Sequence, residues 1–410
     1  MEKLFYKDIH ITEFDAVVTE CSYDEKNKNY RIVLDRTAFF PEEGGQSADK
    51  GTLNVSSPEA APADSSSSGH VSAVLPGVGI QVIDVQIKND IIYHILPTAI
   101  PEGTRVTGQI DWAQRFDFMQ QHSGEHIVSG LVHKHYGYNN VGFHLGLQDV
   151  TLDFNGELTL EQLRAIEAEA NTAIWQNLPV NITYPSAEEL GKLNYRSKLD
   201  LTENVRIVEI PGIDTCACCA PHVETTGQIG LVKITNVQNH RGGVRVNILC
   251  GARAVADYTE KQNSVSNISV QLSAKPTAVS DAVSRLKEEN LRLKELGNTL
   301  QASLLDYAVK KLPAPCETEH AVLFVDIMNE IAIRNVINDL TTKYPGYCAA
   351  FAGNDTDGYR FIIGSTNRDC RELATILRQT LQAKGGGSSP MIQGTVVADK
   401  AALEALLHRQ

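Results

Sequence analysis

The sequence predicts an α+β protein built from four successive parts. Short alternating apolar runs with turn residues between them fill the N-terminal part, and a mixed region of helices and strands follows. A long uninterrupted helical pattern then precedes a stretch where strands and helices alternate. We therefore expect a β-rich, barrel-like domain over 1–107, an α+β domain over 108–262, a helical hairpin or coiled coil over 263–315, and a small α/β domain over 316–410.

Composition is typical of a globular protein and indicates the cellular compartment in which we expect it. It has 410 residues, too many for one ordinary core, and is 42% hydrophobic and 21% charged. The start of the chain lacks the apolar run of a secretory signal, and its eight cysteines are mostly scattered. We expect a cytoplasmic protein whose thiols stay reduced, some of them kept for metal binding.

The first domain is predicted from β-branched runs bounded by Gly, Pro, Asn and Ser. The expected strands are Ile9–Val18, Tyr30–Asp35, Val71–Leu75, Ile80–Gln86, Ile91–Ile95 and Arg105–Ile110. The Ser-, Ala- and Pro-rich stretch Ser56–Gly69 is typical of a surface loop.

In the second part, Asp111 is a helix N-cap and Gly137 a stop signal, which predicts one helix between them. Further helices are expected over Thr159–Trp175 and near Ser186. The expected strands are Val150–Phe154, Val205–Ile210, Gly230–Val237 and Val244–Cys250.

Leucines at helical spacing predict a long helix over 278–312, suited to a hairpin or to the seam of a homodimer. The last part alternates strands and helices and contains a glycine loop after Ala383. The expected elements there are Ala321–Ile327, Glu330–Lys343, Gly346–Ala352, Tyr359–Gly364, Asp369–Ala383 and Lys400–His408.

Two pairs of residues suggest one zinc ion per chain. His122 and His126 are four apart on the predicted helix, so both side chains lie on one face. Cys218 and His222, again four apart, supply the thiolate and imidazole that zinc accepts in a tetrahedral site. The alternative is that the histidines are packed structural residues and that Cys216, Cys218 and Cys219 are ordinary thiols.

Charge counts mildly against a nucleic-acid partner. The net charge is −13, and residues 271–410 carry as many basic as acidic side chains, so residues 1–270 hold the whole deficit. Proteins that bind polyanions usually show a basic footprint, although a local groove can be basic on an acidic protein.

Four ordered motifs give a specific resemblance. They are the Thr37–Gln46 segment with its Phe39-Phe40-Pro41 and Gly44-Gly45-Gln46, the two-histidine helix, Gly142–Gly146 with Thr151–Asp153, and Cys218–His222 followed by Thr226–Gly230. This order resembles the editing domain of alanyl-tRNA synthetase and its free-standing relatives, the alanyl-tRNA editing proteins. The C-terminal part is similar to the DHH-associated domain of the long-form members.

The resemblance implies a hydrolase that deacylates tRNA(Ala) mischarged with serine, with glycine as a second target. It implies zinc ligands at His122, His126, Cys218 and His222, and substrate contacts at Thr37, Gly44, Gly45 and Gln46. It also implies tRNA contacts at Lys384, Gly385, Gly386 and Gly387, where a glycine loop between helices suits phosphate.

Departures from the family pattern leave alternatives open. Cys219-Ala220-Pro221 stands where the family commonly has Gly-Gly-Thr, so Cys216 or Cys219 could compete for the metal. The Ser-Gly-Glu between the two histidines favours the free-standing branch. The competing functions are a non-catalytic, zinc-stabilised tRNA-binding module and the editing of another aminoacyl-tRNA. A full synthetase lacks room for an adenylation domain before residue 30, and no Asp-His-His triplet supports a phosphoesterase.

Overall fold

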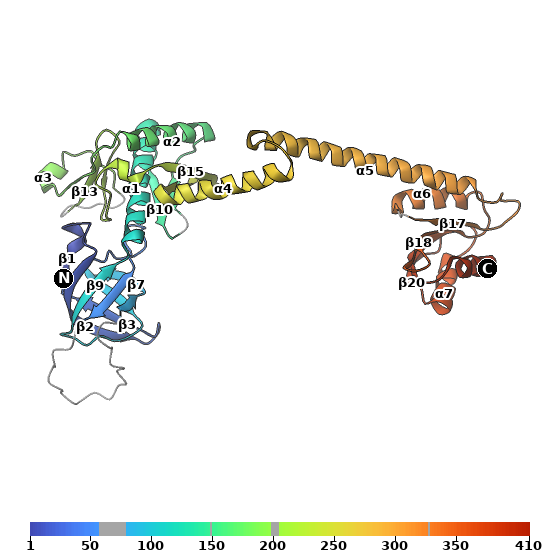
Figure 1. The fold of residues 1–410 in the computed structure, drawn as a ribbon, viewed down its shortest axis with the longest axis horizontal. Coiled ribbons are helices and arrows are strands. Elements are labelled where there is room, and N and C mark those ends of the chain that lie inside the picture. The colour runs from blue at the N-terminus through green and yellow to red at the C-terminus, as the bar shows by residue number, and fades with distance from the viewer. Residues whose placement is uncertain (57–78, 148–149, 198–204, 327–328) are drawn as a thin grey trace, which may run out of the picture. The chain divides into compact units, whose positions relative to one another are not determined.

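The computed structural model describes residues 1–56, 79–147, 150–197, 205–326 and 329–410 (Figure 1). The chain divides into two compact units, Met1–Ser264 and Val265–Gln410, and each contains its own hydrophobic clusters. Several sheets and helices are mixed in it, which confirms the α+β class. The division into four domains stays a prediction.

Among the described residues, seven strands form the N-terminal sheet, in the order β6-β5-β9-β2-β3-β8-β7. Their bounds are β2 Glu13–Asp24, β3 Asn29–Leu34, β5 Gly51–Val55, β6 Gly79–Val82, β7 Asp84–Lys88, β8 Ile91–Leu96 and β9 Arg105–Ile110. Beside this sheet, β1 (Glu2–Lys3) pairs in parallel with β4 (Arg36–Thr37), and the 3-10 turn η1 spans Leu4–Tyr6.

The sheet corrects the barrel-like expectation, because it does not close within the described residues. The predicted strand Ile80–Gln86 is interrupted at Ile83: its first half pairs with β5 and its second half with β8. The two halves, β6 and β7, are the outer strands and are not paired with each other. The predicted strand Val71–Leu75 and all but the first residue of the predicted loop Ser56–Gly69 lie outside the described residues.

Helix α1 (Trp112–Tyr136) carries His122 and His126, the predicted metal ligands, and has the predicted ends. Asp111 accepts a hydrogen bond from Gln114 N, and Gly137 adopts a left-handed conformation with φ of 70°. Its apolar side chains pack in the largest core cluster of the first unit together with α2 (Leu160–Trp175). The predicted start and length of this helix are confirmed.

Two smaller sheets complete the first unit. One has the order β10-β11-β16-β15 and the other β12-β13-β14. Their bounds are β10 Asn140–Leu145, β11 Val150–Phe154, β15 Val232–His240 and β16 Gly243–Cys250, with β12 Asn181–Thr183, β13 Ile207–Ile210 and β14 Asp214–Ala217. The short helices are α3 (Ala187–Leu190) and the 3-10 turn η2 (Thr226–Ile229).

Helix α4 (Gly251–Gln271) begins before the helical part that was predicted from residue 263, so only its end was predicted. Helix α5 (Val279–Lys310), preceded by the 3-10 turn η3 (Pro276–Ala278), matches the expected long helix. The second unit has a sheet of order β17-β18-β19-β21-β20. Its elements are β17 Ala321–Val325, α6 Glu330–Thr341, β18 Cys348–Asn354, β19 Gly358–Gly364, α7 Cys370–Leu381, β20 Lys384–Ser388, β21 Met391–Val396 and α8 Lys400–His408.

The glycine run is a strand, which corrects the predicted loop between two helices. Lys384–Ser388 forms the edge strand β20 and pairs antiparallel with β21. Ladder hydrogen bonds need only the backbone, and Gly385 faces Gly394 so closely that a side chain at either position would meet the opposite strand. Glycine serves here for close pairing of two strands.

Among the described residues, no helix combines the length and the apolar character that crossing a membrane requires.

Candidate metal centre

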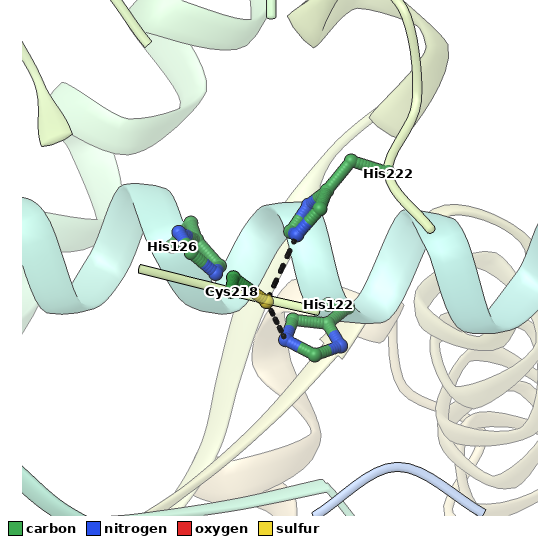
Figure 2. A group of neighbouring side chains, drawn as sticks. All are labelled: His122, His126, Cys218 and His222. Atoms are coloured by element: carbon green, nitrogen blue, oxygen red, sulfur yellow. Dashed lines mark hydrogen bonds between the residues drawn. The ribbon is translucent and has the colours of Figure 1, made fainter. Parts of the chain in front are cut away.

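Four side chains that could hold a metal ion meet inside the first unit, from two distant segments of the chain. His122 and His126 project from successive turns of α1, and Cys218 and His222 lie in the loop after β14. One ligand atom from each of the four lies within 4.8 Å of the others, and the three histidines are buried (Figure 2). The two half-sites indicated by the sequence therefore form one group.

The spacing of the ligand atoms suits a tetrahedral ion. Cys218 Sγ lies 3.5 Å from His122 Nε2 and 3.4 Å from His222 Nε2. A zinc ion with bonds of about 2.3 Å to sulfur and about 2.0–2.1 Å to nitrogen places such atoms about 3.5 Å apart along a tetrahedron edge. Three imidazole nitrogens and one thiol sulfur are also a donor set that zinc prefers. The residues present fit a single zinc ion.

Each imidazole is held at its Nδ1 atom by a different side chain. The partners are Gln46 Oε1 for His122 at 2.8 Å, Asp214 Oδ2 for His126 at 2.9 Å, and Ser123 Oγ for His222 at 3.1 Å. A hydrogen bond at Nδ1 leaves Nε2 as the metal-binding atom and fixes the direction in which the ring points. The three rings are thus oriented before any ion binds.

The Gly44–Gly45 turn positions Gln46 beside His122. The two glycines have φ of 64° and 83°, which is the pair of left-handed residues that a type I′ hairpin turn requires. Glu43 and Gln46 exchange backbone hydrogen bonds of 3.2 and 3.1 Å across the turn. Leu145 N donates to Gly45 O at 2.7 Å, so the hairpin is docked on β10. Gly44 and Gly45 therefore position the wall of the site through their backbone.

The side-chain amide of Gln46, beside the candidate metal centre, has an unused hydrogen-bond donor. The side chain is fully buried, and its Oε1 is bound to His122. Its Nε2 has no hydrogen-bond partner among the described residues. An unpaired buried donor costs about 1–3 kcal/mol, so native proteins rarely keep one without a reason. The amide is suited to donate to a bound molecule beside the metal centre.

A buried ion pair fastens the same segment to α1. Arg115 Nε donates to Asp49 Oδ1 at 2.9 Å, and both side chains are 1% exposed. Asp49 also accepts from Phe40 N at 2.6 Å, and Arg115 donates to Ala38 O at 2.7 Å. The stretch between Thr37 and Asp49 is therefore anchored to the helix that carries the histidines.

Thr37 is fully buried, and its hydroxyl is engaged by His94. His94 Nδ1 lies 3.1 Å from Ile32 O, a carbonyl that can only accept, so Nδ1 carries the proton. Burial lowers the pKa of His94 to about 4, which keeps the ring neutral. His94 Nε2 then accepts from Thr37 Oγ1 at 2.8 Å, and Thr37 Oγ1 accepts from Phe39 N at 3.1 Å. A substrate contact by Thr37 stays a prediction.

Electrostatics favour Cys218 as the thiolate of the centre. Burial alone would raise the pKa of Cys218, but the neighbouring His122 and His222 hold it well below the usual thiol value. Burial lowers the pKa of His222 to about 3, so its ring stays available as a neutral ligand. For His126, burial acts to lower the pKa, while the hydrogen bond with Asp214 outweighs it and raises the pKa.

The two extra thiols of the loop have different surroundings. Burial raises the pKa of Cys216 to about 11, and Cys216 lies beside Asp214 and His126. Burial also raises the pKa of Cys219, which packs against the core of the N-terminal sheet and approaches Gly44. Both thiols hold their protons more strongly than Cys218, which makes them poorer metal ligands.

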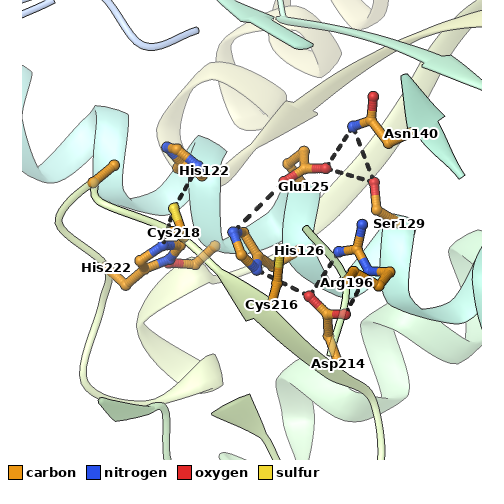
Figure 3. Close-up of polar contacts among 12 residues, drawn as sticks. His122, Glu125, His126, Ser129, Asn140, Arg196, Asp214, Cys216, Cys218 and His222 are labelled. Atoms are coloured by element: carbon orange, nitrogen blue, oxygen red, sulfur yellow. Dashed lines mark hydrogen bonds and ion pairs between the residues drawn. The ribbon is translucent and has the colours of Figure 1, made fainter. Parts of the chain in front are cut away.

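Glu125 borders the centre on another side. Its Oε1 accepts from Ser129 Oγ at 2.5 Å and from Asn140 Nδ2 at 2.6 Å (Figure 3). Its Oε2 lies 3.8 Å from His126 Nε2. The sequence showed only that Glu125 precedes His126, whereas the fold turns the Glu125 carboxylate toward Nε2 of His126.

Several residues of the site could not be identified from the sequence. Asp214 and His94 each contact a residue far away along the chain, and no local motif marks them. Ser123 lies inside the two-histidine motif, but nothing in the sequence indicated its contact with His222. The weak signal for His94 is a histidine at an inward position of a β-branched strand. The predicted tRNA contacts, Lys384–Gly387, lie in the second unit on β20.

Two families match parts of the chain. The family described as "Threonyl and Alanyl tRNA synthetase second additional domain" matches residues 205–246, which include Cys218, His222 and Asp214. The family described as "tRNA synthetases class II (A)" matches residues 2–114, which include Gln46. The matched segments therefore contribute to both walls of the metal centre.

Full-length relatives extend these matches. An alanine–tRNA ligase of Ignicoccus hospitalis is 27% identical over 97% of this chain, and the chain spans only 41% of that relative. Alanyl-tRNA editing protein Aarsd1 of Danio rerio is 24% identical over 98% of this chain and 96% of its own length. Alanyl-tRNA editing protein AlaX-M of Methanosarcina acetivorans is 32% identical over 58% of this chain and 94% of its own length. The chain belongs to the family of alanyl-tRNA editing proteins.

Proposed function

We propose that this protein hydrolyses the ester of tRNA(Ala) mischarged chiefly with serine, and with glycine as a second target. The observation that carries the proposal is the buried Gln46 amide, unpaired at Nε2, beside a preorganised group of three histidines and a cysteine. Family membership and the editing proteins named among the relatives support it. The reaction adds water to the ester carbonyl and breaks its bond to the ribose oxygen, which releases the amino acid and free tRNA.

Zinc is the ion proposed for the centre, held by His122, His126, Cys218 and His222. When bound, zinc supplies a Lewis acid and a fixed positive charge close to the substrate. The chain's own residues hold this group in place, since Gln46, Asp214 and Ser123 orient the three rings. They also exclude bulk water, because the three imidazoles are buried.

Gln46 is proposed to act on the reacting ester. Its Oε1 accepts a hydrogen bond from His122, which fixes the orientation of the amide. Its Nε2 is left as a hydrogen-bond donor without a partner among the described residues. A donor aimed at the carbonyl oxygen stabilises the negative charge that develops there during hydrolysis. Gly44 and Gly45 set this direction, because their left-handed turn places Gln46.

Thr37 is proposed to select serine. The Thr37 hydroxyl donates its hydrogen to His94 and accepts a hydrogen bond from the Phe39 amide with one lone pair. Its second lone pair is therefore the position left for a further hydrogen bond, and it can only accept. A serine hydroxyl can donate to that position, whereas the methyl group of alanine cannot. Such selection is needed because a pocket sized for alanine rejects neighbours that differ by one small group by only about 10–200-fold.

Contacts with the rest of the tRNA are proposed for the second unit. Lys384 and the backbone of Gly385–Gly387 are exposed or half-buried on the edge strand β20, so they can reach a phosphate group. The 278–312 region is proposed as a homodimer seam, since α5 exposes a row of leucines. A cytoplasmic location, where charged tRNA is used, completes the proposal.

Deacylation assays with Ser-, Gly- and Ala-tRNA(Ala) test the function directly. Wild type is compared with a His122→Ala/His126→Ala variant and with His135→Ala, which changes an exposed histidine of the same helix. We expect rapid loss of serine with alanine spared, abolished in the double variant and by zinc removal, and unchanged in His135→Ala. No hydrolysis of any of the three by folded, zinc-loaded protein would contradict editing and leave a non-catalytic tRNA-binding module.

A further inference from the structure

The three imidazoles of the metal centre are not held equally. Gln46 and Ser123, which orient His122 and His222, are neutral, whereas His126 is held by the carboxylate of Asp214. A hydrogen bond to an ionised acceptor is roughly twice as strong as one between neutral groups. A carboxylate behind a metal-binding histidine also raises the basicity of the ligand nitrogen.

Asp214 is itself locked in one orientation. Arg196 Nε donates to Asp214 Oδ1 at 2.7 Å, and Arg196 Nη2 donates to Oδ2 at 2.7 Å. Oδ2 also accepts from His126, so both carboxylate oxygens are used (Figure 3). The Asp214 side chain is 2% exposed and that of Arg196 is 14% exposed, so water competes little for these bonds.

Arg196 is in turn fixed by the strand that contains Asp214. Arg196 N donates to Thr215 O at 2.8 Å, and Ala217 N donates to Arg196 O at 2.9 Å. Strand β14 therefore begins with Asp214, is flanked by Arg196, and leads directly to Cys218. The strand that leads to Cys218 therefore also bonds His126 of α1, 88 residues away in the sequence.

We infer that the Asp214–Arg196 pair is a positioning device that joins the two half-sites and sets how tightly the protein holds its metal ion. Asp214 keeps Nε2 of His126 aimed at the position of the ion, and Arg196 prevents Asp214 from rotating away. This inference rests on the zinc-binding part of the proposed function. Neither residue was indicated by the sequence motifs, and neither is a catalytic residue.

A second metal site is the competing interpretation of the same atoms. His126, Asp214 and Cys216 also place ligand atoms within 4.8 Å of one another. However, Arg196 occupies both oxygens of Asp214, and a guanidinium beside a cation is unfavourable. The geometry makes Asp214 an orienting group for one metal centre.

Zinc affinity of the full-length protein, measured by competition with a chromophoric chelator, tests the inference. Loss of a group behind a metal ligand typically weakens metal binding about 10–100-fold. We expect that range for Asp214→Ala, a smaller loss for Asp214→Asn, which keeps an acceptor oxygen, and a smaller loss for Arg196→Met. Ser123→Ala should weaken binding less than Asp214→Ala. Cobalt-loaded Asp214→Ala should show a shifted visible absorption band, a change that a purely structural role would not cause.

Asp153 supplies a matched control. Arg245 Nε and Nη2 bind its two oxygens at 2.6 and 2.7 Å, and His240 lies 3.7 Å away, so the same three residue types meet outside the metal centre. Asp153→Asn should bind zinc as wild type does. The inference fails if folded Asp214→Ala and Asp214→Asn hold zinc as tightly as wild type, or if Asp153→Asn loses zinc equally. If Asp214→Ala does not fold, the zinc affinity of Asp214→Asn decides between these outcomes.

The proposed function and this inference fail separately. A wild type that binds zinc but deacylates none of the three tRNAs contradicts the editing proposal and leaves the role of Asp214 standing. A wild type that deacylates Ser-tRNA(Ala), with Asp214 variants of unchanged zinc affinity, contradicts the inference alone.

Discussion

The first unit buries polar side chains, whereas the longest helix of the second unit exposes apolar ones. In the first unit, buried Gln46 accepts a hydrogen bond from His122, and buried Asp214 accepts one from His126. On α5, Leu286, Leu293 and Leu300 are 57%, 52% and 55% exposed and recur every seven residues. Burying polar groups is costly unless they are paired, so the first arrangement serves a task inside the unit. The exposed leucines of α5 lack such partners among the described residues, which is why the proposed homodimer seam is placed there.

The largest difference between the first unit and α5 is expected in the stability lost when one partner of an ion pair is removed. Arg115→Met removes one partner of the buried pair with Asp49 and should cost about 3–5 kcal/mol of stability, because the remaining charge is left unpaired. Arg292→Met on α5 removes an exposed pair with Glu289 and should cost less than about 1 kcal/mol. Urea unfolding followed by circular dichroism measures both.

Fluorescence adds a unit-specific readout, since both tryptophans, Trp112 and Trp175, lie in the first unit. Arg115→Met should shift that signal and Arg292→Met should not. If Arg115→Met and Arg292→Met lowered the free energy of unfolding equally, the predicted difference between a buried and an exposed ion pair would be wrong.

His94 makes the first unit sensitive to acid. Its folded pKa of about 4 lies below the usual 6.5, so the unfolded chain binds more protons between these values. Its contribution to stability is present above pH 6.5 and is lost as the pH falls toward 4, by about 3 kcal/mol at 1.36 kcal/mol per unit. Urea unfolding at several pH values should give a steeper decline for wild type than for His94→Gln, whose side chain does not titrate in this range. Parallel declines would contradict a neutral buried ring.

Replacing a glycine by alanine should lower the free energy of unfolding in the first unit and raise it on α5. Gly45→Ala forces a left-handed conformation and brings a side chain against Phe143 O, which should cost about 1–3 kcal/mol and lower deacylation by displacing Gln46. Gly297→Ala lies inside α5 with open space around it and should stabilise the helix by roughly 0.5–1 kcal/mol. Thermal unfolding of both variants gives the signs, and a stabilising Gly45→Ala would contradict the hairpin's role.

The smallest effect is expected for the exposed leucines. Leu293→Gln and Leu300→Gln should change the free energy of unfolding of the monomer by no more than about 0.5 kcal/mol, because both side chains are already solvated. If α5 forms a homodimer seam, the same variants should lower the mass seen by light scattering. A wild type that stays monomeric at high concentration would contradict the seam.

Local signals predicted elements well where caps and periodicity agree. Helix α1 begins after Asp111 and ends before Gly137 as expected, because capping hydrogen bonds are made within a few residues. The start of helix α4, before residue 263, was not predicted, because only Gly251 and Ala254 of this helix are buried and no apolar stripe marks it. The glycine run was assigned to a loop because its strand character comes from pairing with β21, not from side chains.

The sequence by itself determined the types and the two spacings of the proposed metal ligands, since a helical turn brings His122 beside His126 whatever surrounds it. Only the tertiary structure decided which groups orient the rings. Asp214, Ser123 and Gln46 reach their histidines across 88, 99 and 76 residues of chain. Such contacts depend on where whole elements pack, and no short stretch of sequence encodes that.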